Sequence, residues 1–199
     1  MKTCKQFSFL LLTIFCCVSV NAQKVELDIK YLTVAPGADD NTIVYNQHRK
    51  LGIADFKASP DEGSGAAAIT SSGFMFKAGY RSFQGKATLI ISVYCSFDKA
   101  TSWMKEKAKN NYILSHEQHH FDISYISTLL FIKKIKKTSF KQDNYMAQLK
   151  EVYNQAVEDM ENLQHRYDTD TNNGILKDKQ AEWNKKIDDQ LASLAAEKY

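Results

Sequence analysis

The spacing of hydrophobic residues changes about halfway along the chain, and this change predicts the fold class. In residues 25–31 apolar side chains alternate with charged or polar ones, which is typical of a half-buried strand. Residues 87–97 form an almost unbroken apolar run rich in Ile, Val and Tyr, which predicts a strand buried on both faces. We expect one or two further strands in residues 69–80. The first half of the chain is therefore expected to form a small sheet.

From residue 101 onward the spacing becomes helical. Asp98 and Thr101 are both candidate caps for a helix that continues toward residue 137. Residues 144–167 carry apolar side chains three and four positions apart along one face, which predicts the clearest helix. A turn over residues 168–174 precedes a last helix, whose expected inward-facing residues are Trp183, Ile187, Leu191 and Leu194. The expected fold class is α+β, with a small antiparallel sheet in the N-terminal half followed by three or four helices.

The first 22 residues have the features of a secretory signal peptide. Lys2 and Lys5 precede an apolar run over residues 7–20, and Val20-Asn21-Ala22 supplies small residues at the cleavage positions. The run is shorter than the roughly 20 residues that span a bilayer. We therefore expect an exported protein, periplasmic or extracellular, with residues 1–22 removed, residues 23–199 as one domain and no stable membrane span.

Loss of the leader changes the cysteine count and the charge. Of four cysteines only Cys95 remains, so no internal disulfide is expected, and its apolar surroundings predict an inert buried thiol. Lys2 and Lys5 are removed as well, so 24 of the 26 Lys and Arg residues remain, compared with 23 Asp and Glu residues. A chain so close to neutral gives no reason to expect nucleic acid as a partner.

The residues that carry chemistry lie at His116-Glu117-Gln118-His119-His120. Positions four apart on a helix are neighbours, so His116 and His120 can bind one Zn²⁺ ion. Glu117 can then take a proton from a water at an open coordination position, as the general base. This is the H-E-x-x-H arrangement of zinc peptidases. The alternative is a solvated helix face that happens to be rich in His.

A catalytic zinc needs a third protein ligand, for which the sequence offers several candidates. His165 and Asp168 close the long second helix, and Glu158 and Glu161 lie earlier on it. Asp168 is the first choice, because it lies where the helix gives way to a turn and can point inward. For each candidate the alternative is an ordinary surface residue.

Three further residues near these patterns have expected roles. His119 points to another side of the helix and is expected to be a surface residue or to support a ligand rather than to be one. Asp122 is a candidate hydrogen-bond partner of a ligating imidazole, because such imidazoles usually donate to a carboxylate. His48 is expected to be exposed.

Several segments carry a resemblance to a known family: Asp55-Phe56-Lys57, Ala66 to Gly73, Ser102-Trp103, His116 to Ile123, Tyr167 to Gly174, and Gln180 to Trp183. In these the chain resembles the DUF922 family, a group of predicted secreted zinc-dependent proteases of bacteria. The resemblance implies a zincin-like metallopeptidase architecture, with His116 and His120 as zinc ligands and Glu117 as general base. The chain departs from the family at Asn173, where a His often stands. If that His is the family's third ligand, Asp168 or a water must substitute for it here.

Two main functions remain open from the sequence. The leading one is zinc-dependent hydrolysis of a peptide or protein substrate outside the cytoplasm. The alternative is a catalytically inactive exported or envelope-associated binding protein on the same fold, with a structural metal or none. A third reading is hydrolysis of a non-peptide amide such as one in cell-wall material.

Overall fold

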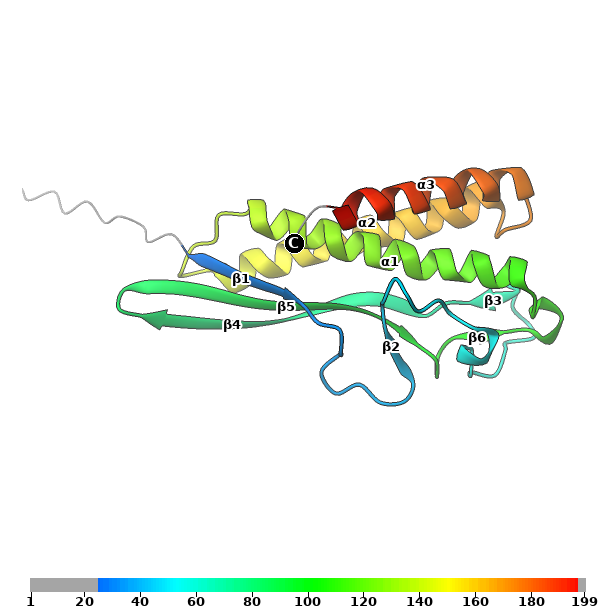
Figure 1. Ribbon diagram of the computed structural model, residues 1–199, viewed down its shortest axis with the longest axis horizontal. Helices are drawn as coiled ribbons and strands as arrows, with labels where there is room; N and C mark the ends of the chain where they lie inside the picture. The colour runs from blue at the N-terminus through cyan, green and yellow to red at the C-terminus, as the bar shows by residue number, and fades with distance from the viewer. Residues whose placement is uncertain (1–24, 197–199) are drawn as a thin grey trace, which may run out of the picture.

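The computed structural model describes residues 25–196 and shows two layers, a twisted sheet and three helices stacked on one of its faces (Figure 1). The strands are β1 (Glu26–Tyr31), β2 (Thr42–Val44), β3 (Ala68–Ile69), β4 (Ser72–Phe83), β5 (Lys86–Asp98) and β6 (Trp103–Met104). The helices are α1 (Asn111–Lys137), α2 (Tyr145–Thr171) and α3 (Lys177–Ala196). The expected α+β class is confirmed, with three helices after the sheet. The predicted signal peptide lies outside the described residues.

The main sheet is mixed, so the expectation of an antiparallel sheet was wrong in part. β5 is central: β4 pairs with it antiparallel along one edge, while β1 and β2 share the other edge. β1 runs parallel to β5, from the pair Glu26↔Thr88 to the pair Tyr31↔Val93. A parallel pair needs a long connection rather than a hairpin, and the intervening chain, which includes β2 to β4, supplies it.

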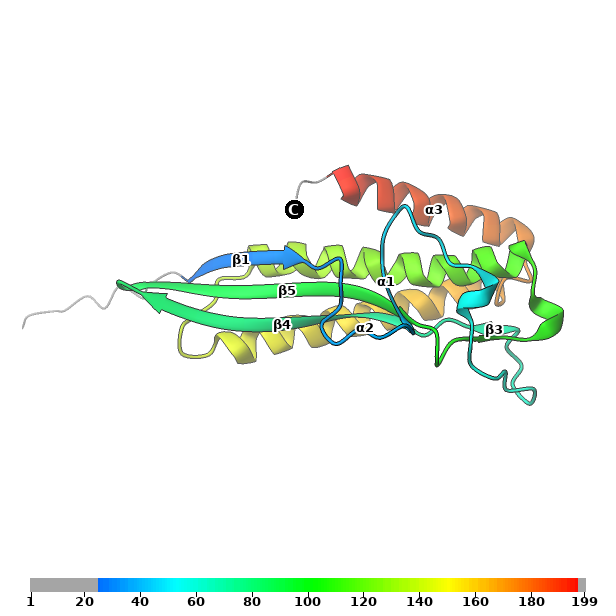
Figure 2. The same cartoon turned by 60° about the horizontal axis from the view of Figure 1, so that its bottom comes forward.

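Only one face of the sheet is covered by helices, and this corrects the prediction for residues 87–97. Leu89, Ile91, Val93, Cys95 and Phe97 point to the helices and are completely buried. On the opposite face the side chains of Ile90, Ser92 and Ser96 are only half-buried. In Figure 2 the β4–β5 hairpin reaches beyond the ends of the helices. The apolar run is therefore a strand with one fully buried face.

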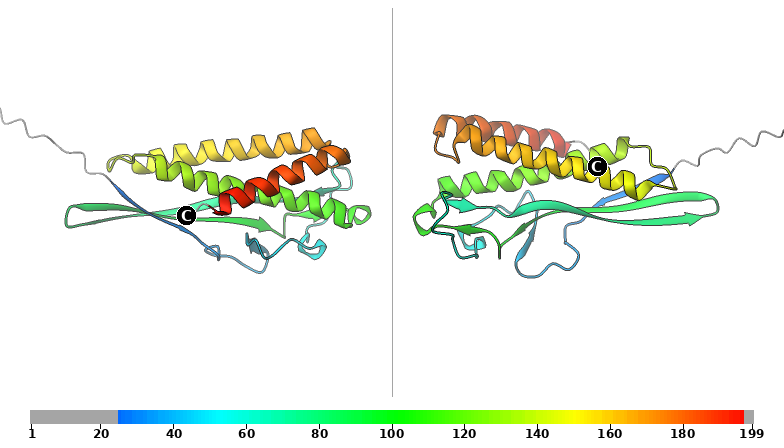
Figure 3. Two further views of the ribbon diagram at one scale, coloured as in Figure 1. Left: turned by 45° about the horizontal axis from the view of Figure 1, so that its top comes forward. Right: turned by 180° about the vertical axis from the view of Figure 1, so that it is seen from behind.

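α1 packs against β4 and β5 on one side and against α2 and α3 on the other, as the two views of Figure 3 show. Its buried residues face the sheet on one side and α2 and α3 on the other, and they include the polar stretch His116 to His119. The helix begins after Asn110, whose side chain accepts hydrogen bonds from the amides of Tyr112 and Ile113. The expected caps Asp98 and Thr101 were wrong, because the chain after them forms β6, which pairs with β3.

The expected inward face of the last helix is confirmed, since Trp183, Ile187, Leu191 and Leu194 are all buried. None of the helices within residues 25–196 is long and apolar enough to cross a membrane.

Candidate metal centre

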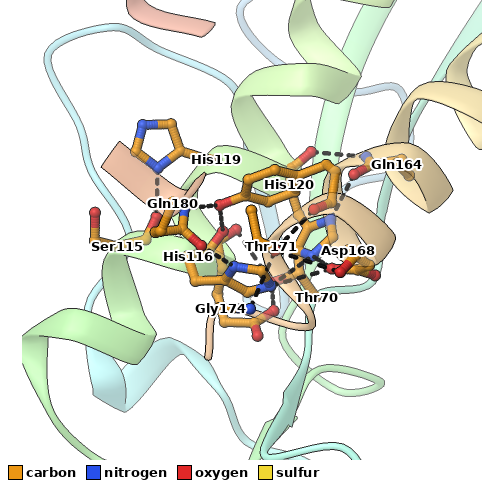
Figure 4. A network of polar contacts seen from close by, with 12 residues as sticks. Thr70, Ser115, His116, His119, His120, Gln164, Asp168, Thr171, Gly174 and Gln180 are labelled. Carbon is orange, nitrogen blue, oxygen red and sulfur yellow. Dashed lines mark hydrogen bonds and ion pairs between the residues drawn. The ribbon is translucent and has the colours of Figure 1, made fainter. Parts of the chain in front are cut away.

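The helices bring His116, His120 and Asp168 to one point, with the two histidines on α1 and the aspartate in the last turn of α2 (Figure 4). The two Nε2 atoms are 3.2 Å apart, and Asp168 Oδ1 lies 3.2 Å from His116 Nε2 and 2.9 Å from His120 Nε2. Ligands about 2.0–2.1 Å from a tetrahedral zinc are separated from one another by about 3.3 Å. The three atoms are therefore spaced like one face of such a tetrahedron, and the residues fit a zinc ion.

Two glutamines fix the orientation of the imidazoles. His116 Nδ1 lies 2.8 Å from Gln180 Oε1, and His120 Nδ1 lies 2.5 Å from Gln164 Oε1. The amide nitrogens are used elsewhere: Gln180 Nε2 donates to the Tyr167 hydroxyl and Gln164 Nε2 to the His120 carbonyl. The glutamine oxygens accept from Nδ1 of each imidazole, so Nε2, which faces Asp168, is the nitrogen that would bind a metal.

The electrostatics of the protein without an ion favour positive charge at this point. Burial by itself raises the pKa of Asp168, but the hydrogen bonds and charges of His116 and His120 outweigh it and hold the pKa well below its usual value. Burial lowers the pKa of His120, but the hydrogen bond to Asp168 and the charge of Glu117 outweigh this and raise it. The carboxylates of Asp168 and Glu117 therefore favour positive charge beside His120.

An aromatic ring and a glycine hold His116 from both sides. The Tyr167 ring, which is fully buried, stacks on the His116 ring at a centroid distance of 4.7 Å. A Cβ at Gly174 would lie 3.2 Å from His116 Nδ1, and the residue has φ +79°, a left-handed conformation that favours glycine. Tyr112 donates a hydrogen bond to the Gly174 carbonyl at 2.6 Å. The loop after α2 thus packs directly on the histidine ring.

Glu117 lies beside this triangle at the wall of a cleft. The residue is only 4% exposed, and Thr70 Oγ1 donates to Glu117 Oε2 at 2.7 Å. The cleft has a volume of about 390 Å³, and His116, His120 and Asp168 line it as well. Its acidic lining residues are Glu117, Glu161 and Asp168, and no Lys or Arg is among the described lining residues. The cleft therefore brings the triangle and a buried carboxylate together.

The short strand β3 and its flanking residues, Ala66 to Thr70, also line the cleft. Lys105 N donates to Ala67 O at 2.9 Å, so the peptide groups of Ala67 and Ile69 face β6. In an antiparallel pair the alternate peptide group, that of Ala68, points away from the partner strand. Among the described strands, β3 pairs only with β6.

The structure does not group the remaining candidate ligands with the triangle. His48, His165 and Glu158 are exposed, as expected for His48. Glu161 lines the cleft, and so does Asn173, which lies after the end of α2. Asn173, where the chain departs from the DUF922 pattern, thus lines the same cleft as the triangle. The third corner of the triangle is Asp168.

The expectations for Asp122 and His119 need correction. Asp122 contacts neither candidate ligand; it accepts from the Tyr45 hydroxyl and from Gln118 instead. His119 points away from the triangle, as expected, but it is buried (Figure 4). The residues that support the imidazoles, Gln164 and Gln180, were not identified from the sequence. Gln164 could have been found from the sequence, because it lies one helical turn before Asp168. No local sequence pattern points to Gln180.

No family model, curated protein or solved structure matches this chain. The resemblance to DUF922 therefore stays a prediction, and the functional argument depends on the geometry of the site.

Proposed function

We propose that the protein is a zinc-dependent metallopeptidase with a zincin-like architecture, which hydrolyses peptide bonds outside the cytoplasm. The observation that carries the proposal is the convergence of His116 Nε2, His120 Nε2 and Asp168 Oδ1 at the wall of a cleft that also contains the Glu117 carboxylate. Three protein ligands with an open fourth position are the arrangement of catalytic rather than structural zinc sites.

Each group in the cleft has a role in this proposal. When bound, zinc supplies a Lewis acid and makes a water acidic enough to ionise near neutral pH. Glu117 acts as the general base that accepts the proton of the attacking water and then delivers it to the leaving amine. The hydrogen bond from Thr70 orients the Glu117 carboxylate, since it fixes one of the two oxygens.

The second edge of β3, which pairs with no other described strand, supports a peptide as the substrate. An extended peptide can add to an exposed strand edge through main-chain hydrogen bonds. The small side chains of Ala66, Ala67 and Ala68 leave room for the backbone of such a peptide beside the triangle.

A structural metal is the second candidate function, and one observation favours it. The triangle joins α1 to α2, and its supporting residue Gln180 belongs to α3, so a bound ion would fasten all three helices together. In that case the protein would be an exported binding protein with a metal that stabilises its fold.

The two candidates are separated by metal analysis and one substitution in residues 23–199. We expect zinc to remain bound after dialysis and one equivalent of it to be lost in His116→Ala. Glu117→Gln should keep that zinc but lose peptide hydrolysis by roughly 10²–10⁴-fold, the usual contribution of a general base. Glu158→Gln, at an exposed position on α2, is the matched control and should retain activity.

Full activity in Glu117→Gln would overturn the assigned mechanism. If wild-type protein binds zinc, melts at a lower temperature after chelation and cleaves nothing in a broad peptide library, the structural reading is correct.

A further inference from the structure

A second group of potential metal ligands lies on another side of α1. His119 and Asp122 come from α1 and Asp188 comes from α3, and one potential ligand atom from each lies within 4.8 Å of the other two. In Figure 4 the His119 ring points away from the His116–His120–Asp168 triangle. The two groups therefore share a helix but no residue.

His119 is a buried imidazole that is already oriented for binding. The residue is 6% exposed, and Nδ1 lies 2.6 Å from the Ser115 carbonyl, which makes Nδ1 the protonated nitrogen. The opposite nitrogen, Nε2, lies 3.7 Å from Asp188 Oδ1, and within residues 25–196 it has no hydrogen bond. An imidazole whose Nδ1 donates to a backbone carbonyl is the common arrangement for a metal ligand that binds through Nε2.

Asp122 is a buried carboxylate with one oxygen largely uncompensated. The residue is 1% exposed, and its Oδ1 accepts from the Tyr45 hydroxyl at 2.7 Å and from Gln118 Nε2 at 2.8 Å. Among residues 25–196 its Oδ2 has only Lys50 Nζ as a partner, at 3.5 Å, and the Lys50 side chain is mostly exposed to solvent. Since a buried carboxylate is costly without a close positive partner, a cation beside Asp122 would stabilise it.

We propose that His119, Asp122 and Asp188 form a second site, for a divalent transition-metal ion. One imidazole and two carboxylates are donors that suit Zn²⁺, Mn²⁺ or Fe²⁺. The atoms are further apart than in the first triangle, so the Asp188 side chain, which is 65% exposed, moves inward on binding. Lys50 competes with the ion for Asp122 and is displaced into solvent. A bound ion then ties α3 to α1 through residues that the first site does not use.

The test is a zinc titration of residues 23–199, in which substitutions at two adjacent exposed positions of α3 are compared. Asp188→Asn should lower the number of bound equivalents by one relative to wild type, and Asp189→Asn should not. Asp189 is a matched control because it is an exposed neighbour on the same helix, paired with Lys185. Neither variant alters a buried residue, so both should fold. The difference between the two counts does not depend on whether the first site binds zinc.

Two further variants test the parts of the site. His119→Asn should remove the same equivalent, while His48→Asn, at an exposed histidine, should keep it. Lys50→Gln should tighten the second equivalent by roughly two- to fivefold, the scale of a lost exposed ion pair. Lys30→Gln, at an exposed lysine that also pairs with an aspartate, should leave it unchanged.

Equal counts in Asp188→Asn and Asp189→Asn would overturn the proposal, and so would an unchanged count in His119→Asn. The group would then be only an ion pair between His119 and Asp188 that packs α3 on α1.

Discussion

The hydrogen bond between His116 and Gln180 gives the sharpest test of how the triangle is held. Gln180→Leu keeps a side chain of similar size but removes the oxygen that accepts from His116 Nδ1 at 2.8 Å. Both side chains are buried, so water does not readily replace the lost acceptor. A buried donor left without a partner costs about 1–3 kcal/mol. The Tyr167 hydroxyl loses its donor in the same substitution.

The effect on zinc binding follows from this cost. Loss of a hydrogen-bond partner of a ligating histidine typically weakens metal binding about 10–100-fold. That factor corresponds to about 1.4–2.7 kcal/mol, which agrees with the cost of the unpaired donor. We expect Gln180→Leu to raise the dissociation constant for zinc at the first site by this factor. Competition with a chromophoric chelator at constant pH measures it.

Two companion variants make the result specific. Gln180→Glu restores an oxygen acceptor for His116 Nδ1 and should recover most of the affinity, whereas Gln155→Leu changes an exposed glutamine on α2 and should have no effect. If Gln180→Leu binds zinc as tightly as wild type, the orientation of His116 does not depend on Gln180 and the reasoning is refuted.

Three other predictions address the remaining parts of the structure. Gly174→Ala should lower both the melting temperature and the zinc affinity, because its Cβ would press on His116. The left-handed backbone alone should lower the free energy of unfolding by about 1–2 kcal/mol. Gly65→Ala, where a Cβ meets no atom within 4 Å, is the thermal-melt control. Without metal, urea unfolding should show that Asp168 stabilises the fold at pH values above its unfolded-state pKa of about 3.9. This contribution should be lost as the pH falls through the lower pKa of Asp168 in the folded protein, and Asp168→Asn should remove this pH dependence. Cys95 should not react with a thiol reagent in the folded protein but should react in denaturant, because burial raises the pKa of its thiol; reaction at equal rates in both conditions would contradict its burial.

The local parts of the site were accessible from the sequence, because helical spacing alone brings two residues four apart to one face. His116 and His120 follow from this rule, and the structure places Asp168 with them at the end of the next helix. Whether they bind zinc stays a prediction. Gln180 could not be assigned, since its contact with His116 joins positions 64 apart and depends on how α3 packs.

The errors in the fold have a common physical cause. The direction of β1, the pairing of β6 with β3 and the single covered face of the sheet are all decided by contacts between distant segments. An apolar run such as residues 87–97 reports burial but not which layer provides it. α1 shows the same limit, because a helix packed on two sides buries polar and apolar residues alike and has no clear apolar stripe.

α3 connects the first site and the proposed second site through one element. Gln180 supports His116 near the start of this helix, and Asp188 faces His119 about two turns later. Between them Trp183 and Ile187 are buried, so the segment that faces α1 is continuous. An ion at either site would therefore strengthen the packing of the same helix. The free energy of that packing would couple the two sites, since each ion would bind more tightly to a protein whose α3 is already held in place by the other.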